Sequence, residues 1–171
     1  MKPFRFIIYG QPATKKNSAT LGYSRGKGMR PIPQLLPSKA YRAYEQHCRE
    51  ALAALRTKTK LPHFDGPVQI IALYYLESAA HWPDLLGLEQ ATADILSDEY
   101  KVLDHKRTLI REWLLSDDRI IKSWDGSKIA GIDREKPRID VQIVPLELNA
   151  ETELDPKLRK QAAEAMQGGL F

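Results

Sequence analysis

Apolar and polar residues follow one another in this chain with two different periods, which predict both strands and helices. Residues 4–9 form an apolar run that stops at a Gly-Gln-Pro turn, as is typical of a first strand. Residues 68–76 form a longer apolar run with β-branched and aromatic side chains, which predicts a largely buried strand. Shorter or alternating apolar patterns predict two more strands at residues 120–124 and 138–146.

Two segments have the spacing of amphipathic helices. Ser38 follows a proline and can cap a helix over residues 39–56. A second helix is predicted over residues 84–97, because Pro83 and Asp84 suit a helix start and apolar residues follow near helical spacing. Residues 98–116 are ambiguous, and a further helix is one interpretation. The apolar positions of the second helix are Leu85, Leu88, Thr92, Ile95 and Leu96.

The residues between these elements set the organisation of the chain. Residues 13–37 are rich in Lys, Arg, Gly, Ser and Pro and are expected to form a long loop, and loops of this length are usually functional or disordered. The predicted order of strand, loop, helix, strand, helix and two strands indicates one α+β domain with a mixed sheet packed by helices. We expect this domain to span residues 1–148, followed by a C-terminal tail at 149–171.

Composition narrows the class of protein. No apolar run approaches the roughly 20 residues needed to span a bilayer. The first residues lack the apolar core and cleavage site of a signal peptide, so we expect a cytoplasmic protein with no membrane partner. Cys48 is the only cysteine, which excludes an intrachain disulfide and argues against a Cys-ligated zinc site.

The net charge of +4 conceals a strong asymmetry between two parts of the chain. Residues 1–60 hold 13 Lys and Arg and two acids, a net charge of +11, whereas residues 61–171 carry −7. Concentrated positive charge suits nucleic-acid phosphates, and interleaved aromatic residues suit backbone contacts. The alternative is a solvated basic face. The candidate DNA-binding residues are Lys15, Lys16, Asn17, Arg25, Lys27 and Arg30.

Acidic residues lie at the ends of predicted elements in the second part. Asp84 opens the second helix, Asp94 is near its end, and Asp117-Asp118 precede the next strand. If these termini meet at one sheet edge, their carboxylates could hold Mg²⁺, or Mn²⁺ in its place, which would activate water for phosphodiester cleavage. The alternative is a helix N-terminal charge plus an Asp-Asp turn, because aspartate is common in both settings.

Short motifs follow one another in a characteristic order along residues 4–146. They are Gly10-Gln11-Pro12, Lys15-Lys16-Asn17-Ser18, Pro37-Ser38-Lys39-Ala40-Tyr41, Gly66-Pro67-Val68, Pro83-Asp84, Asp94-Ile95-Leu96, Asp117-Asp118-Arg119-Ile120-Ile121 and Pro137-Arg138-Ile139-Asp140-Val141. In order and spacing they resemble the RusA-type Holliday junction resolvases, which are small endonucleases. No single motif is specific; their combination carries the resemblance.

The resemblance implies a RusA-like fold and a Mg²⁺-dependent, homodimeric endonuclease. Such an enzyme nicks branched DNA symmetrically in recombination or repair, and would be associated with the nucleoid. The family's catalytic aspartates would correspond to Asp84 and Asp118, with Asp94 and Asp117 beside them. The metal ligands would be Asp84, Asp94 and Asp118.

The chain also departs from the family pattern. The usual Asp-x-Asp-Asn run and the lysine after it are replaced by Asp84-Leu85-Leu86-Gly87 and Gln90, and the stretch between Asp94 and Asp117 is longer. Asp125 and Lys128 could supply the missing carboxylate and cation, or could belong to a plain Asp-Gly turn. The alternative function is a catalytically impaired protein that binds branched DNA by its structure.

The C-terminal residues suggest a further partner. Gln167-Gly168-Gly169-Leu170-Phe171 resembles the Gln-x-x-Leu-Phe peptide by which bacterial replication and repair proteins bind the β sliding clamp. Gln167 could form an orienting hydrogen bond, while Leu170 and Phe171 could insert into an apolar pocket. The alternative is that both apolar residues fold back onto this protein or form a frayed end.

Overall fold

The computed structural model describes five continuous segments of the chain and a few positions of the C-terminal tail. The segments are residues 2–15, 20–24, 32–80, 82–103 and 106–147, and the tail positions are 156, 159–160 and 163–164.

A mixed sheet of five strands is built around one long strand, β4 (Val68–Leu76). On one side β4 pairs antiparallel with β9 (Arg138–Pro145), which pairs antiparallel with β1 (Phe4–Tyr9). On the other side β7 (Ile121–Ser123) and β8 (Lys128–Ile132) run parallel to successive parts of β4. The mixed sheet inferred from the sequence is confirmed.

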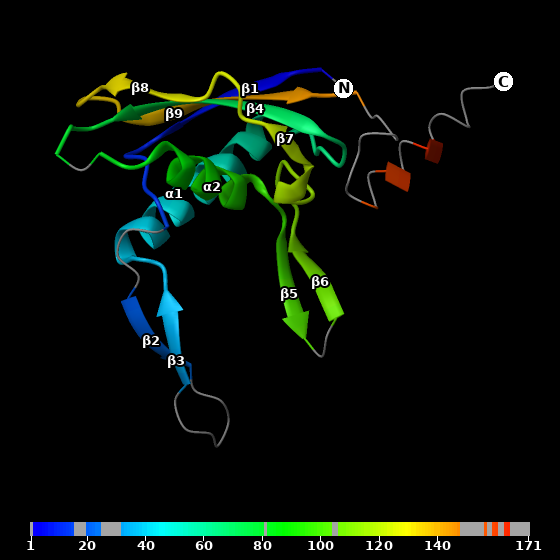
Figure 1. Cartoon of the computed structure of the whole chain (residues 1–171), viewed down its shortest axis with the longest axis horizontal. Coiled ribbons are helices and arrows are strands. Elements are labelled where there is room, and N and C mark those ends of the chain that lie inside the picture. The colour runs from blue at the N-terminus through cyan, green and yellow to red at the C-terminus, as the bar shows by residue number, and fades with distance from the viewer. Residues whose placement is uncertain are drawn as a thin grey trace.

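Two helices cover one face of this sheet, as Figure 1 shows. They are α1 (Lys39–Lys58) and α2 (Leu85–Leu96). Alternate residues of β4 are fully buried while those between them are partly exposed, so one face of the sheet packs into the core and the other stays open. The described part of the chain therefore forms a single α+β domain of two helices, this sheet and small hairpins.

The core lies between the sheet and the helices. Large side chains with almost no solvent exposure come from every layer, and burying each contributes about 1.5–3 kcal/mol relative to exposure. The segment before η1 (Asp118–Ile120), a 3₁₀ turn, adds three consecutive buried residues to this core. The principal members are Phe6, Ile8, Tyr44, Cys48, Leu52, Ile70, Tyr74, Leu88, Ile95, Trp113, Leu114, Leu115, Val141 and Ile143.

The helix starts agree with the sequence signals. The Ser38 hydroxyl accepts a hydrogen bond from the Tyr41 backbone N–H at 3.0 Å, so the predicted cap of α1 is confirmed. Asp84 caps α2 in the same way by accepting from the Gly87 N–H. Neither described helix is long and apolar enough to cross a membrane.

Two segments fold differently from the expectation. Part of the expected loop at 13–37 is an antiparallel pair, β2 (Thr20–Ser24) and β3 (Ile32–Leu36). The ambiguous segment after α2 is not a helix but a second pair, β5 (Glu99–Leu103) and β6 (Lys106–Arg111). Both pairs are held by cross-strand pairing. Their described side chains are exposed or only partly buried, so the alternating pattern of a half-buried strand is absent among them. Strand β8 was also not predicted.

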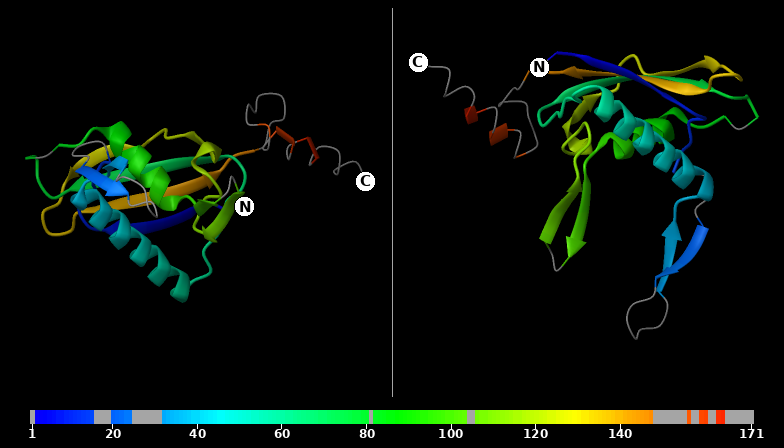
Figure 2. Two further views of the ribbon diagram at one scale, coloured as in Figure 1. Left: turned by 90° about the horizontal axis from the view of Figure 1, so that it is seen from below. Right: turned by 180° about the vertical axis from the view of Figure 1, so that it is seen from behind.

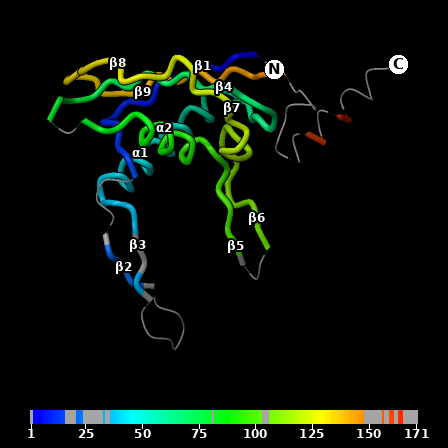
Figure 3. The backbone as a smooth tube through the Cα atoms, viewed as in Figure 1, coloured from blue at the N-terminus to red at the C-terminus, as the bar shows by residue number. Residues whose placement is uncertain are grey.

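Both pairs project away from the sheet on the side of the helices. Figure 1 and the tube in Figure 3 show them extending in the same general direction, with α2 at the level of their bases. The views from below and behind in Figure 2 keep the two pairs apart. The fold thus places two extended arms around the end of α2 and η1.

Candidate active site

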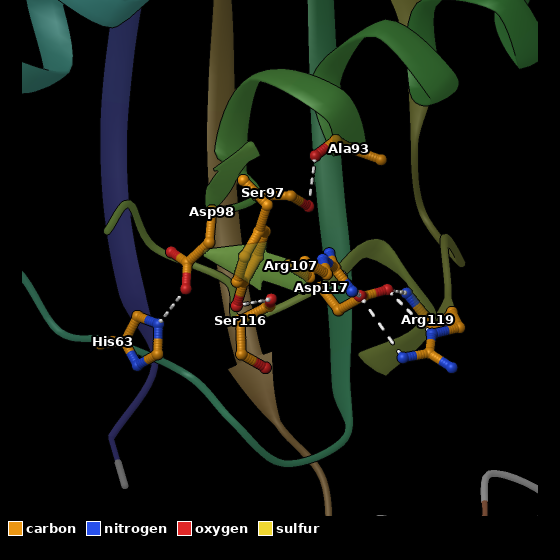
Figure 4. A network of polar contacts seen from close by, with 9 residues as sticks. His63, Ala93, Ser97, Asp98, Arg107, Ser116, Asp117 and Arg119 are labelled. Atoms are coloured by element: carbon orange, nitrogen blue, oxygen red, sulfur yellow. Dashed lines mark hydrogen bonds and ion pairs between the residues drawn. The ribbon is translucent and has the colours of Figure 1, made fainter. Parts of the chain in front are cut away.

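Asp117 begins the 3₁₀ turn η1 and is held by two arginines. Its carboxylate accepts hydrogen bonds from the Arg119 backbone N–H at 3.2 Å and side-chain Nε at 3.0 Å. The Arg107 guanidinium donates to the other carboxylate oxygen at 3.2 and 3.3 Å, as Figure 4 shows. Burial opposes ionisation of Asp117, but the hydrogen bonds from Arg119 and Asp118 outweigh it and lower its pKa well below the usual range.

Asp118 has the opposite electrostatic environment. Partial burial raises the pKa of its carboxyl, and the adjacent Asp117 raises it further through a hydrogen bond and through charge. The charge of Asp94 adds to this effect. Two carboxyl groups in contact, with the charge of a third acting on one of them, are in a position that attracts a proton or another cation.

Asp94 lies in the last turn of α2 and is tied to two other segments. Its carboxylate accepts from the Lys15 ammonium at 2.9 Å, across 79 positions of sequence. Its backbone carbonyl accepts from the Arg49 guanidinium of α1 at 3.3 Å. Arg49 also forms ion pairs with Glu45 and Glu99. The end of α2 is therefore locked to α1, to β5 and to the N-terminal segment.

A buried hydroxyl lies next to this network. Tyr41 of α1 is only 1% exposed, and its hydroxyl has no hydrogen-bond partner among the described residues. Burial raises the pKa of Tyr41 above its ordinary range, with additional contributions from the Glu45 and Asp94 charges. The hydroxyl is thus kept protonated beside the acidic residues.

Asp84 is not brought into this group. It caps the first turn of α2, whereas Asp94 lies ten residues later, about 15 Å along the helix axis. At this separation the two side chains do not reach one ion. A β-carbon on Gly87 would come within 2.9 Å of the Asp84 carboxylate and 3.1 Å of Thr14, so this helix start is tightly packed. The local role of Asp84 is to satisfy the start of α2.

Asp125 and Lys128 also lie elsewhere. Gly126 has a φ of +89°, and a β-carbon there would lie 3.5 Å from Ile71, whose side chain is on the open face of the sheet away from the helices. Ser127 fills the gap between β7 and β8 by bonding the Ala72 N–H and the Ile70 carbonyl. The Asp-Gly-Ser turn therefore continues the sheet edge along β4 and does not meet Asp117 and Asp118.

The remaining predicted site residues fall outside the described part of the chain, with one exception. Lys15 is described and binds Asp94. The other DNA-binding candidates, Lys16, Asn17, Arg25, Lys27 and Arg30, lie outside the described residues, as do Gln167, Leu170 and Phe171 of the proposed clamp peptide.

The sequence interpretation missed Arg107 and Arg119, the two cations that hold Asp117. Arg119 directly follows the Asp-Asp pair, so a turn signal could have indicated it. No local signal of comparable strength marks Arg107, because Asp104-His105 between the two runs is not one of the favoured hairpin-turn pairs.

The geometry limits what kind of metal site this group could form. Among the described residues, no three His, Cys, Asp or Glu side chains converge as a metal-binding cluster. Mg²⁺ in phosphoryl-transfer sites is often held by only one or two carboxylates and completed by water and substrate oxygens. The adjacent carboxyl groups of Asp117 and Asp118 fit such an open site. A metal ion bound there would first have to displace Arg107 or Arg119 from Asp117.

Comparison with known proteins adds no family assignment. No model of a known protein family matches the chain, and no curated protein sequence matches it significantly.

Proposed function

We propose that this protein is a Mg²⁺-dependent endonuclease that nicks branched DNA in recombination or repair, with a RusA-like fold and a cytoplasmic, nucleoid-associated location. One observation carries the proposal: the charges of Asp94 and Asp117, from two elements, both act on Asp118, and cations from two other segments bind Asp94 and Asp117. Lys15 belongs to the strongly basic N-terminal part, and Arg107 belongs to a projecting arm.

The residues have complementary roles in this proposal. Asp117 and Asp118 would hold the metal, which when bound would activate water and neutralise charge on the scissile phosphate. Lys15 would exchange Asp94 for a DNA phosphate, because its side chain is about half exposed and can reorient. Arg107 would stay bonded to Asp117 and hold that carboxylate in place. Asp84 supports the site by fixing the start of α2; a direct catalytic role for it stays a prediction.

A second function is favoured by the ion pairs themselves. Asp94 and Asp117 are already neutralised by Lys15, Arg107 and Arg119, and Asp84 lies apart. A protein with these features could bind branched DNA by its structure without cutting it. The family lysine on α2 is replaced by Gln90, which also favours this alternative.

A nicking assay separates the two functions. The full-length protein is incubated with a labelled four-way junction and a linear duplex, with Mg²⁺ or Mn²⁺ and with EDTA. We expect metal-dependent nicks in the junction and none with D118N, which removes a charge at nearly constant volume. Junction binding without nicks by the wild-type protein would select the binding-only function, and absence of binding to either DNA would reject both.

The nuclease proposal includes a homodimer, because symmetric cutting of a four-way junction requires two sites related by a two-fold axis. Sedimentation of the protein alone and with junction DNA tests it. A 19.5 kDa monomer under both conditions at micromolar concentration would contradict the dimer.

The proposed partner of the C-terminal peptide is the β sliding clamp. Docking would raise the local concentration of the enzyme on replicating or repaired DNA. A peptide covering residues 161–171 is titrated against the clamp. Absence of binding at on the order of 100 micromolar, which corresponds to about −5.5 kcal/mol, would reject this partner. Equal binding by a peptide that carries L170A and F171A would also reject it.

A further inference from the structure

Most of the described side chains of the β5–β6 arm are exposed. All six residues of β6 are solvent-exposed, and so are Lys101 and Val102 of β5. Figures 1 and 2 show the arm extending away from the helix layer. A two-stranded ribbon is marginally stable on its own in water, so a ribbon retained in this form is well suited to gain contacts from a partner.

The strand register divides the arm into two chemically different faces. Residues directly opposite each other in an antiparallel pair share a face. The pairs Lys101↔Thr108 and Leu103↔Lys106 place two lysines on one face. The pairs Tyr100↔Leu109 and Val102↔Arg107 give the other face apolar and aromatic groups with one arginine.

The lysines of the first face are available to a partner. Within the described part of the chain, Lys101 and Lys106 form no ion pair, although both are exposed. Arg111, also exposed, adds a third cation at the base of the arm, where its guanidinium lies 5.4 Å from the centre of the Trp113 ring. Three cations along one ribbon match a polyanion better than an apolar protein surface.

Arg107 fixes the orientation of the arm relative to the acidic residues. Its guanidinium stacks 3.8 Å from the centre of the Tyr100 ring and bonds the Asp117 carboxylate. The side chain thus joins both strands of the arm to the start of η1. A partner bound along the arm would therefore lie next to Asp117 and Asp118.

We propose that the β5–β6 arm is a DNA-binding ribbon that enters the major groove of a duplex beside the acidic site. The major groove of B-form DNA admits a two-stranded ribbon, and Lys101 and Lys106 would contact its phosphates. The exposed side chains of Val102, Leu109 and Ile110 would contact sugars and thymine methyl groups in the groove. This inference rests on the proposed function, since it assigns a second DNA contact to the same site.

Fluorescence anisotropy on a DNA duplex, a duplex RNA of equal length and a four-way junction tests the ribbon separately from cleavage. The variant K101A/K106A is compared with the control variant R134A/K136A. The control also removes two exposed cations, but from the connection between β8 and β9. We expect K101A/K106A to lower the slope of log affinity against log salt by about 1.8, or about 0.9 per phosphate contact. R134A/K136A should leave the slope unchanged, and K101R/K106R should restore it.

Each other outcome has a defined meaning. An unchanged slope for K101A/K106A, while the wild-type protein binds DNA, would overturn the ribbon but leave the proposed function standing. Equal affinity for duplex RNA would overturn major-groove entry, because the RNA major groove is too narrow for side chains to read. Loss of self-association by L109E without a change in DNA affinity would show that the arm joins two protein copies instead. Absence of DNA binding by the wild-type protein would reject the proposed function itself.

Discussion

The Lys15 ammonium donates a hydrogen bond to the Asp94 carboxylate at 2.9 Å, joining the basic N-terminal segment to the last turn of α2. The two side chains are 46% and 28% exposed, so water screens their attraction. Pairs of this kind typically contribute about 0–1 kcal/mol to folding. The contact is therefore better suited to positioning a cation beside the acidic site than to stabilising the fold.

Replacing Lys15 should separate these two roles. We expect K15A to change the free energy of unfolding by less than about 1 kcal/mol, because the ion pair is partly exposed. The same variant should lower the salt slope of DNA affinity by about 0.9 if Lys15 also contacts a phosphate. Urea unfolding and DNA anisotropy measure the two effects, with K136A as the control. A large loss of stability with unchanged DNA affinity would show that the contact is structural.

Asp84 can be tested as a helix cap and as a catalytic residue at the same time. D84A should lower the free energy of unfolding by about 1 kcal/mol, because the Gly87 N–H loses its acceptor. D84S should retain most of the stability, since serine is also a good cap.

Nicking by D84S then decides the second role. Full activity in this stable variant would restrict Asp84 to capping. Lost activity with retained stability would show that the carboxylate itself takes part in the reaction.

The elements that bury a face could be predicted from the sequence. Strand β4 and helices α1 and α2 have long apolar patterns and local capping residues such as Ser38, so both their type and their position follow from neighbouring residues. The two hairpins could not be predicted in this way. Leu21 and Tyr23 are 69% exposed, and Val102 is 66% exposed, so their strands leave no burial pattern in the sequence.

The acidic site was predictable only in part, for a related reason. Asp94, Asp117 and Asp118 lie at element ends, where local signals locate them. Their cations come from distant or ambiguous segments: Lys15 is 79 positions from Asp94, and Arg107 belongs to the segment whose structure was ambiguous. Pairing across such separations depends on the packing of α1, α2 and η1, which no local pattern contains.

Cys48 should react with thiol reagents only when the protein unfolds. Its side chain is fully buried in the core, and burial raises the pKa of its thiol to about 12. At pH 8 we expect slow modification by a disulfide reagent, with a rate that rises with urea in step with the unfolded fraction. The urea-unfolded protein provides the maximum rate as a control. Rapid stoichiometric labelling of the native protein would contradict the buried position.

Asp117 and Asp118 should give opposite dependences of stability on pH. Burial and the neighbouring Asp117 and Asp94 raise the pKa of Asp118 above its ordinary value of 3.8. A carboxyl with a raised pKa in the folded state contributes stability that is fully present below the unfolded pKa and is lost as the pH rises through the folded pKa. D118N cannot ionise, so its melting temperature should rise relative to that of the wild-type protein as the pH increases from 4 to 7.

D117N is the matched control, because the pKa of Asp117 is lowered by its hydrogen bonds to Arg119 and Asp118 despite burial. A lowered pKa gives stability that is present above the unfolded pKa and lost as the pH falls through the folded pKa. D117N should therefore have a lower melting temperature than the wild-type protein at pH 7. The difference between the two melting temperatures should become smaller as the pH falls toward 3. Thermal unfolding of the three proteins across this range measures both trends. The same direction of change for D117N and D118N would contradict the contrasting environments of the two carboxyl groups, and with them the electrostatic basis for binding a cation at this pair.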